Sequence, residues 1–258
     1  MRGMTAGIEA VLFDLDDTLL DGDAAGQSGL RALLALCPSV DWQAAVAAWD
    51  TAFREHFPPY LRGEITMEQS RAARMRAWAD LMAIPVRAGA ESAWFDWYLA
   101  GYQEGWSVFG DVAGCLDALA GLRLGVITNG DGGQQRAKIT AIGLDGRFEV
   151  VIASGDAGFP KPDPRIFHMA ADALGLPPGQ CLFVGDNRDG DAVGARAAGM
   201  HGVWLNRRSE AAGDDMAADD TAGDAAAGEA AAGDAAADDG VPEITSLAEL
   251  PGLVLRGR

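Results

Sequence analysis

The chain has 258 residues, 49% of them hydrophobic, which is enough to bury a sizeable core in one or two domains. No apolar run approaches the ~20 residues that a membrane-spanning helix needs, and residues 1–10 lack the charged-then-apolar order of a signal peptide. We therefore expect a cytoplasmic protein with no membrane partner. The net charge of −18 also disfavours nucleic acid as a partner, and three widely spaced cysteines argue against a disulfide framework or a zinc site.

Much of the negative charge lies in one segment. Residues 209–240 are almost entirely Ala, Gly and Asp, and they carry ten acidic side chains with no Lys or Arg, which leaves −8 for the remaining chain. Such a composition cannot bury enough apolar surface to offset its ordering entropy, so a disordered insert is expected. A solvated loop is the favoured reading of this insert, and an acidic partner-binding segment is the alternative.

The rest of the chain alternates between short apolar runs and helix-like stretches. Runs rich in Val, Ile and Leu, predicted as strands, occur at residues 10–13, 122–127, 150–153, 181–184 and 202–205. Helices are predicted between the last four of them, at residues 134–142, 164–174 and 189–198, each followed by glycine. Unbroken apolar strands separated by helices predict a doubly wound parallel α/β sheet covered on both faces.

A stretch of about ninety residues interrupts this alternation after the first strand. It reads as helices at residues 30–36, 42–57, 67–82 and 92–103, and it holds six of the seven tryptophans. We expect the tryptophans to pack the core of a small helical bundle. The predicted organisation is a core domain of residues 1–20 and 111–258 with an inserted helical cap of residues 21–110, whose place in the chain suits a lid over the ligand-binding edge of the sheet.

Two carboxylates, Asp14 and Asp16, follow the first strand directly. On an extended strand, residues i and i+2 point to the same side, so both would face one pocket. Acid pairs often only close turns, but acids buried at the end of an apolar strand require a compensating cation. The pair is therefore a candidate site.

Three further features stand at the ends of other predicted strands. Thr128 and Asn129 offer hydrogen-bond donors to an anion. Lys161 is held between prolines, so it is a candidate phosphate ligand or counter-ion, although a solvated lysine on a turn is the better interpretation of this segment taken alone. Asp186 is explained best by a hard cation, whereas Asp191 could also simply suit the start of a helix.

All four features lie at the carboxyl ends of parallel strands and so converge on one edge of the sheet. Three carboxylates favour Mg²⁺, and the lysine and small donors favour phosphate. This combination indicates phosphoryl transfer.

In the order of these motifs, the chain resembles the haloacid dehalogenase-like hydrolase superfamily. The residues that carry the resemblance are Asp14-Leu15-Asp16-Asp17-Thr18, Thr128-Asn129, Lys161-Pro162-Asp163-Pro164 and Gly185-Asp186 through Asp191. The inserted helices look like the C1-type cap of its subfamily I. The resemblance covers nearly the whole chain except the acidic insert. It implies a Rossmann-like core and a phosphatase of that superfamily that acts on a small phosphorylated metabolite.

The resemblance also implies roles. Asp14 would attack phosphorus and form an aspartyl phosphate, and Asp16 would act as general acid and base. Mg²⁺ would be held by Asp14, the backbone carbonyl of Asp16 and Asp186, with Asp191 orienting either Lys161 or a metal-bound water. Thr128 and Asn129 would hold phosphoryl oxygens, and Lys161 would neutralise Asp14 and the phosphate.

Several alternatives stay open. A haloacid dehalogenase is disfavoured because Asp16 is present, and a phosphomutase because Thr18 stands where mutases usually carry Val or Ile. An acidic-segment interaction protein on the same scaffold and a phosphoacceptor signalling domain are further possibilities; the large helical insert speaks against the second. The sequence indicates neither the oligomeric state nor which cap residues read the substrate.

Overall fold

The computed structural model describes residues 7–208 and 240–255. The acidic segment expected at residues 209–240 lies outside the described residues, except for Gly240 at its end. The described chain forms two compact units: residues up to Leu20 together with those from Val108 onward, and residues 21–107. No helix in the described part of the chain has the length and apolar character needed to cross a membrane.

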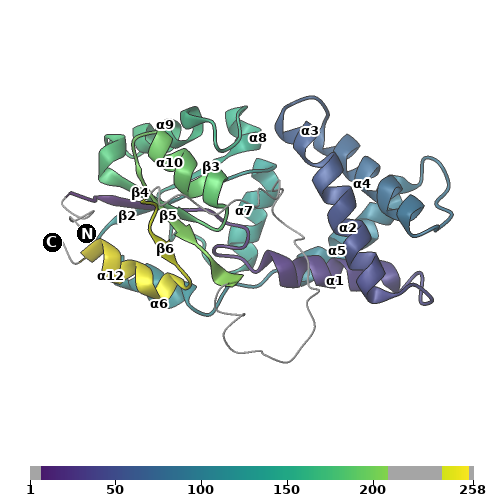
Figure 1. The fold of residues 1–258 in the computed structure, drawn as a ribbon. Coiled ribbons are helices and arrows are strands. Elements are labelled where there is room, and N and C mark those ends of the chain that lie inside the picture. The colour runs from purple at the N-terminus through teal and green to yellow at the C-terminus, as the bar shows by residue number, and fades with distance from the viewer. Residues whose placement is uncertain (1–6, 209–239, 256–258) are drawn as a thin grey trace. The chain divides into compact units, whose positions relative to one another are not determined.

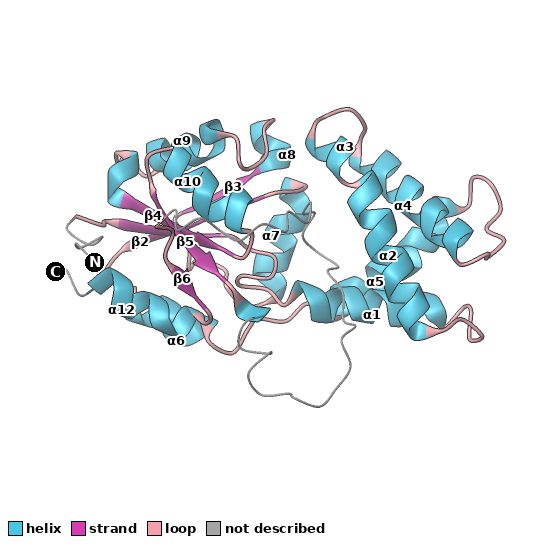
Figure 2. Ribbon diagram, in the orientation of Figure 1, coloured by secondary structure: helices cyan, strands magenta, loops and turns pink. Residues whose placement is uncertain are grey.

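The first unit is built around a six-stranded sheet, drawn in magenta in Figure 2. Every pairing is parallel, and the strand order is β3-β2-β1-β4-β5-β6. The predicted doubly wound parallel sheet is confirmed, and the sequence reading missed only the two-residue edge strand β6. The strands are β1 (Ala10–Phe13), β2 (Arg123–Thr128), β3 (Val150–Ala153), β4 (Cys181–Gly185), β5 (His201–Leu205) and β6 (Glu243–Ile244).

Helices cover both faces of this sheet (Figure 1). Side chains of α9 (Pro164–Ala173) and α10 (Gly194–Ala197) pack with Leu12 and Phe183 in a buried apolar cluster on one face. In Figure 1, α6 (Val112–Ala118) and α12 (Leu250–Leu255) lie on the opposite side. The remaining elements are α7 (Gly132–Ala141), α8 (Ser154–Ala157), and the short helical turns η1 (Pro178–Gln180), η2 (Arg188–Val193) and η3 (Leu247–Glu249).

Local sequence signals account for several element boundaries. The Asp163 side chain caps α9 by accepting a hydrogen bond from the Arg165 N–H, with Pro164 at the first helical position. The predicted helix over residues 189–198 differs, because its first part is the π-helical turn η2 and only Gly194–Ala197 is α-helical. Wider turns of this kind are frequent at functional sites, and this one carries the buried Asp191.

The second unit is entirely helical in its regular structure. Trp49 and Trp78 are almost completely buried in its core, as expected, whereas Trp97 is 56% exposed and does not belong to that core. Helices α1 and α5 pack closely, and a Cβ added at Gly101 of α5 would lie 2.5 Å from the Ala32 Cβ of α1. The helices are α1 (Gly22–Leu34), α2 (Trp42–His56), α3 (Pro58–Leu61), α4 (Met67–Leu81) and α5 (Glu91–Glu104).

Candidate active site

The parallel register brings three predicted site residues to one edge of the sheet. Phe13 at the end of β1 pairs with Val126 of β2 and Val184 of β4. Asp14 therefore emerges between the ends of β2 and β4, and its N–H donates to the Val184 carbonyl at 2.9 Å. The neighbouring strands end at Thr128 and just before Asp186, so the convergence expected at the carboxyl edge is present.

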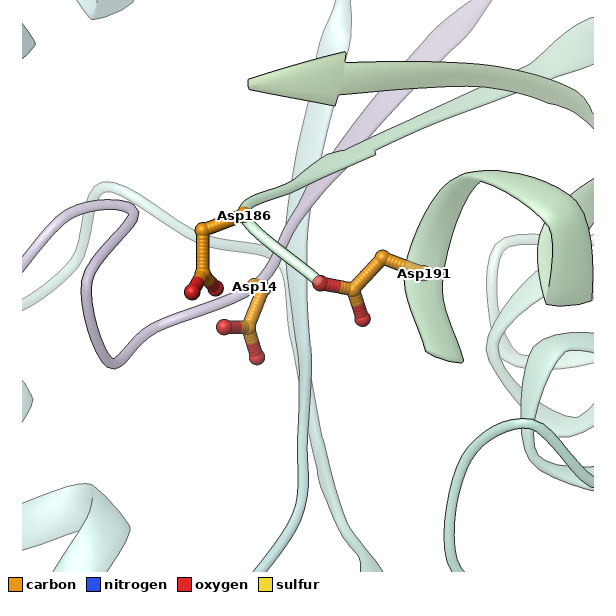
Figure 3. Close-up of side chains that lie close together, drawn as sticks. All are labelled: Asp14, Asp186 and Asp191. Carbon is orange, nitrogen blue, oxygen red and sulfur yellow. The ribbon is translucent and has the colours of Figure 1, made fainter. Parts of the chain in front are cut away.

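Three of the four residues predicted at the metal site lie together. Asp14, Asp186 and Asp191 each offer a carboxylate oxygen, and these atoms lie within 4.8 Å of one another (Figure 3). Asp14 is 6% exposed and Asp191 1% exposed, so their charges are removed from water. Oxygen ligands at this spacing, in a buried and anionic setting, suit a hard divalent cation such as Mg²⁺.

The same crowding of acids perturbs their protonation. Burial raises the pKa of Asp14 to about 7, although the nearby Lys161 ammonium counteracts the shift. Burial, with the charges of Asp14, Asp17 and Asp191, also raises the pKa of Asp186 well above its ordinary value. In the absence of a metal ion these carboxylates repel one another, and a bound cation would relieve that repulsion.

Lys161 lies inside this acidic cluster. Its Nζ is 2.6 Å from an oxygen of Asp14 and 2.6 Å from an oxygen of Asp191. Burial by itself would lower the pKa of the Lys161 ammonium, but the two carboxylates raise it above its ordinary value. Lys161 therefore stays charged and serves as counter-ion to both acids. Asp191 thus lies where it could orient Lys161, and that role stays a prediction.

The Asn129 side chain holds the backbone of Lys161. The Lys161 N–H donates to Asn129 Oδ1 at 2.8 Å, and Asn129 Nδ2 donates to the Lys161 carbonyl at 3.2 Å. This reciprocal pair ties the end of β2 to the proline-flanked loop. With its side chain engaged in this way, phosphate binding by Asn129 would fall to its backbone amide, and it stays a prediction.

Thr18 organises the turn that follows the first carboxylate pair. Its side-chain oxygen accepts the Asp186 N–H at 3.1 Å, and Thr18 itself is fully buried. Asp17, just before it, has a left-handed backbone with φ of 56°, a conformation that Asp tolerates better than most residues. Thr18 thus ties the turn after β1 to the residue that follows β4.

Asp16 is held by two residues that the sequence reading did not single out. Lys138 Nζ donates to Asp16 Oδ1 at 2.5 Å, and Gln135 Nε2 donates to Asp16 Oδ2 at 2.9 Å. Gln135 also donates to Thr128 Oγ1 at 2.6 Å. The side chain of Asp16 thus turns toward α7, and metal binding by its backbone carbonyl stays a prediction. Two long polar residues three apart on a helix that follows a strand-end motif are the signal that could have found this pair.

Comparison with known proteins agrees with this geometry. A family model described as haloacid dehalogenase-like hydrolase matches residues 8–199. The N-acylneuraminate-9-phosphatase of Rattus norvegicus is 30% identical over 213 residues, which cover 78% of this chain and 83% of that protein. A phosphoserine phosphatase of Thermus thermophilus is 46% identical over 87 residues, only 34% of this chain and 35% of that protein.

A solved structure extends the likeness to nearly the whole chain. The 2-haloacid dehalogenase of Pseudomonas syringae is 26% identical and superposes with a TM-score of 0.62 over 97% of this chain and all of that one. The chain thus shares its fold with a dehalogenase and is similar in sequence to phosphatases, so the fold alone does not decide the reaction. The chain belongs to the haloacid dehalogenase-like hydrolase family, and the expectation of an enzyme of that superfamily is confirmed.

Proposed function

We propose that this protein is a Mg²⁺-dependent phosphomonoester hydrolase that acts on a small phosphorylated metabolite through an aspartyl phosphate on Asp14. The observation that carries the proposal is the pairing of Asp14, buried and ion-paired with Lys161, with a second carboxylate, Asp16, two residues further on. Hydrolysis of a phosphate ester needs both a nucleophile and a group that moves protons. The related phosphatases support the same reaction class.

Each half of the reaction assigns a task to this pair. In the first half, an oxygen of Asp14 bonds to phosphorus as the ester P–O bond breaks, and protonated Asp16 gives its proton to the departing alcohol oxygen. In the second half, Asp16 takes a proton from water as the water oxygen bonds to phosphorus. The bond from Asp14 to phosphorus then breaks and releases orthophosphate, and both side chains are ready for another cycle.

The cationic and neutral donors would stabilise the phosphoryl group. Lys161, 2.6 Å from Asp14, is close enough to offset charge on a phosphoryl oxygen next to the nucleophile. The Thr128 hydroxyl and the Asn129 backbone amide lie at the end of the adjacent strand and would bind the remaining oxygens. These contacts are expected to matter most in the transition state, where the charge on those oxygens is redistributed.

The donor set fits Mg²⁺. Asp14, Asp186 and the backbone carbonyl of Asp16 would hold the ion, and Asp191 would support Lys161 or a metal-bound water. When bound, the ion would neutralise the carboxylates and let the anionic substrate approach the anionic nucleophile. The raised pKa values of Asp14 and Asp186 support this, because they reflect the cost of burying several negative charges close together.

A haloacid dehalogenase is the second candidate, favoured by the structural likeness to the Pseudomonas syringae enzyme. In that reaction the carboxylate attacks carbon, and the halide leaves without a proton. Asp16, held by Lys138 and Gln135, would have no such role there. The mutase reading stays disfavoured by Thr18, and an interaction role for the acidic segment stays a separate possibility.

The test is phosphate release from p-nitrophenyl phosphate and a panel of phosphometabolites, with Mg²⁺ and with EDTA. We expect metal-dependent turnover in the wild type, none with Asp14→Asn, and wild-type turnover with the control Asp172→Asn, which changes an exposed acid on α9. Quenching with borohydride during turnover should convert position 14 to homoserine, detectable by peptide mass spectrometry. Release of halide from 2-chloropropionate, with no phosphate release, would instead establish the dehalogenase.

A further inference from the structure

Helix α7 presents two buried polar side chains to the strand ends. Gln135 is 2% exposed and Lys138 3% exposed, and they lie three residues apart on the same face. Burying a lysine is unfavourable unless its ammonium is paired and hydrogen-bonded. Both side chains reach Asp16, which is 119 and 122 residues earlier in the chain.

The two donors engage different oxygens of one carboxylate. Lys138 binds Oδ1 and Gln135 binds Oδ2, so the plane of the Asp16 carboxylate is fixed as well as its position. Gln135 also binds the Thr128 hydroxyl and the Asn129 carbonyl at 3.2 Å. One side chain therefore ties Asp16 to the strand end that would hold the phosphoryl group.

The Asp16 side chain is still 20% exposed to solvent. Its fixation by α7 thus leaves part of the carboxylate accessible, as a group that exchanges protons with a substrate must be. The neighbouring Asp14 has a separate cation, Lys161, so each carboxylate of the pair has its own lysine. The two lysines come from different segments and do not substitute for each other.

We propose that Lys138 and Gln135 are positioning residues that hold Asp16 in the orientation for proton transfer to the leaving oxygen and from the attacking water. This inference rests on the proposed phosphatase function. Neither side chain exchanges a proton itself in the proposal: the proton moves between Asp16 and the ester oxygen as the P–O bond breaks, and from water to Asp16 as the phosphoenzyme is cleaved. Misplacing Asp16 by even a small distance should slow both transfers.

The choice of substrate separates this role from a merely structural one. A p-nitrophenyl leaving group departs readily without protonation, whereas an alkyl leaving group needs the acid. For Lys138→Met we expect kcat/KM to fall less than about threefold with p-nitrophenyl phosphate and about 100-fold with an alkyl phosphate, with phenyl phosphate between them. With p-nitrophenyl phosphate the variant should also show a burst of nitrophenolate, because breakdown of the phosphoenzyme still needs Asp16 as base.

A double-mutant cycle tests whether Lys138 acts through Asp16. Asp16→Asn should show the same dependence on leaving group, and Asp16→Asn with Lys138→Met should be no slower than Asp16→Asn alone. Gln135→Leu provides a second variant should Lys138→Met fold poorly, as judged by thermal unfolding. Arg136→Gln, an exposed neighbour on α7 paired with Asp156, serves as the control and should match the wild type on every substrate.

The outcomes are distinct. A loss that grows with the pKa of the leaving alcohol, a burst, and no added loss in the double variant support the inference. A uniform loss across leaving groups, additive losses in the cycle, or unchanged kinetics with all substrates would overturn it while leaving the phosphatase proposal intact. Absence of turnover by well-folded wild type would overturn the proposed function and this inference with it.

Discussion

The two units of this protein bury charge in opposite ways. At the edge of the sheet, buried acids and lysines stand in direct contact, as with Asp14, Lys161 and Asp191. In the helical unit the one buried cation of comparable depth among the described residues is Arg74, which is 7% exposed and faces aromatic rings. No carboxylate of the described chain lies within ion-pair distance of its guanidinium.

This difference shows which interactions specify chemistry and which specify packing. Burial at the sheet edge raises the pKa of Asp14 to about 7, which means that the fold disfavours the ionised form of this carboxyl. Burial lowers the pKa of Arg74 to about 10, an effect that Tyr98 and Tyr102 partly counter, and its guanidinium lies over three phenylalanine rings. Buried carboxylates with raised pKa values, as at the sheet edge, are typical of an active site. Cation–π packing of a buried arginine, as in the helical unit, is typical of a structural core.

The largest effect should come from removing the lysine at the sheet edge. Lys161→Met leaves Asp14 and Asp191 buried without their counter-ion, so we expect kcat/KM to fall about 1,000-fold and the free energy of unfolding in EDTA to fall by about 3–5 kcal/mol. Steady-state kinetics and thermal unfolding measure both. Arg165→Met, which removes an exposed cation of α9, is the control, and equal losses in the two variants would contradict this account of Lys161.

Next in size is loss of the aromatic core of the helical unit. Trp78 is fully buried and donates its indole N–H to the Ala45 carbonyl at 3.1 Å. Trp78→Ala should lower the free energy of unfolding by about 3–5 kcal/mol, because it creates a cavity. Denaturant titration followed by fluorescence measures it, with Trp97→Ala, 56% exposed, expected to change stability by less than about 0.5 kcal/mol. Similar losses from both tryptophans would refute the assignment of this core.

A smaller effect is expected for the dependence of Mg²⁺ affinity on pH. Protons compete with Mg²⁺ for carboxylates, and the raised pKa of Asp14, about 7, places that competition between pH 6 and pH 8. Since a higher pH removes the competing proton, Mg²⁺ should bind about tenfold more tightly at pH 8 than at pH 6 and stabilise the fold by about 1.4 kcal/mol more.

The stability of the metal-free protein should fall, not rise, as the pH increases from 6 to 8. A folded pKa above the unfolded value stabilises the fold at low pH, and that contribution is lost as the pH rises toward 7. The difference in Tm between Mg²⁺ and EDTA should therefore widen with pH. Asp186→Asn should abolish the difference at every pH, and a wild-type difference that stays constant would count against metal binding by these carboxylates.

The smallest effect should come from replacing the buried cation of the helical unit, Arg74, with methionine. Arg74→Met removes a buried cation that has no acid to leave behind, so the lost cation–π contacts and the relieved desolvation should nearly cancel, to within about 1 kcal/mol. Thermal unfolding measures this. A fall in kcat/KM with unchanged stability would contradict a purely structural role for Arg74.

Much of the fold followed from local pattern. The apolar runs before Asp14 and Asp186 are strands of the central sheet because unbroken Val, Ile and Leu runs suit buried parallel strands. Thr66 and Ser246 each form a capping box at the start of a helical turn, a signal that is local in the sequence. The helix predicted from residue 189 differs from the structure, where its first turn is π-helical. The prediction that all the tryptophans of this stretch pack inward is wrong for Trp97, because helical periodicity alone does not say which face packs inward.

The sequence by itself determined which residues stand at the strand ends, because a strand, its end and the following turn are set by neighbouring residues. Asp14, Thr128 and Asp186 could be named on that basis and meet at one edge. Only the tertiary structure decided how their side chains are used: that Asn129 holds the Lys161 backbone, and that Lys138 and Gln135 hold Asp16. Those contacts join residues 32 to 122 positions apart in the chain. The polar pair on α7 can be noticed in the sequence, but its partner Asp16 is identified only when the helix is packed against the sheet.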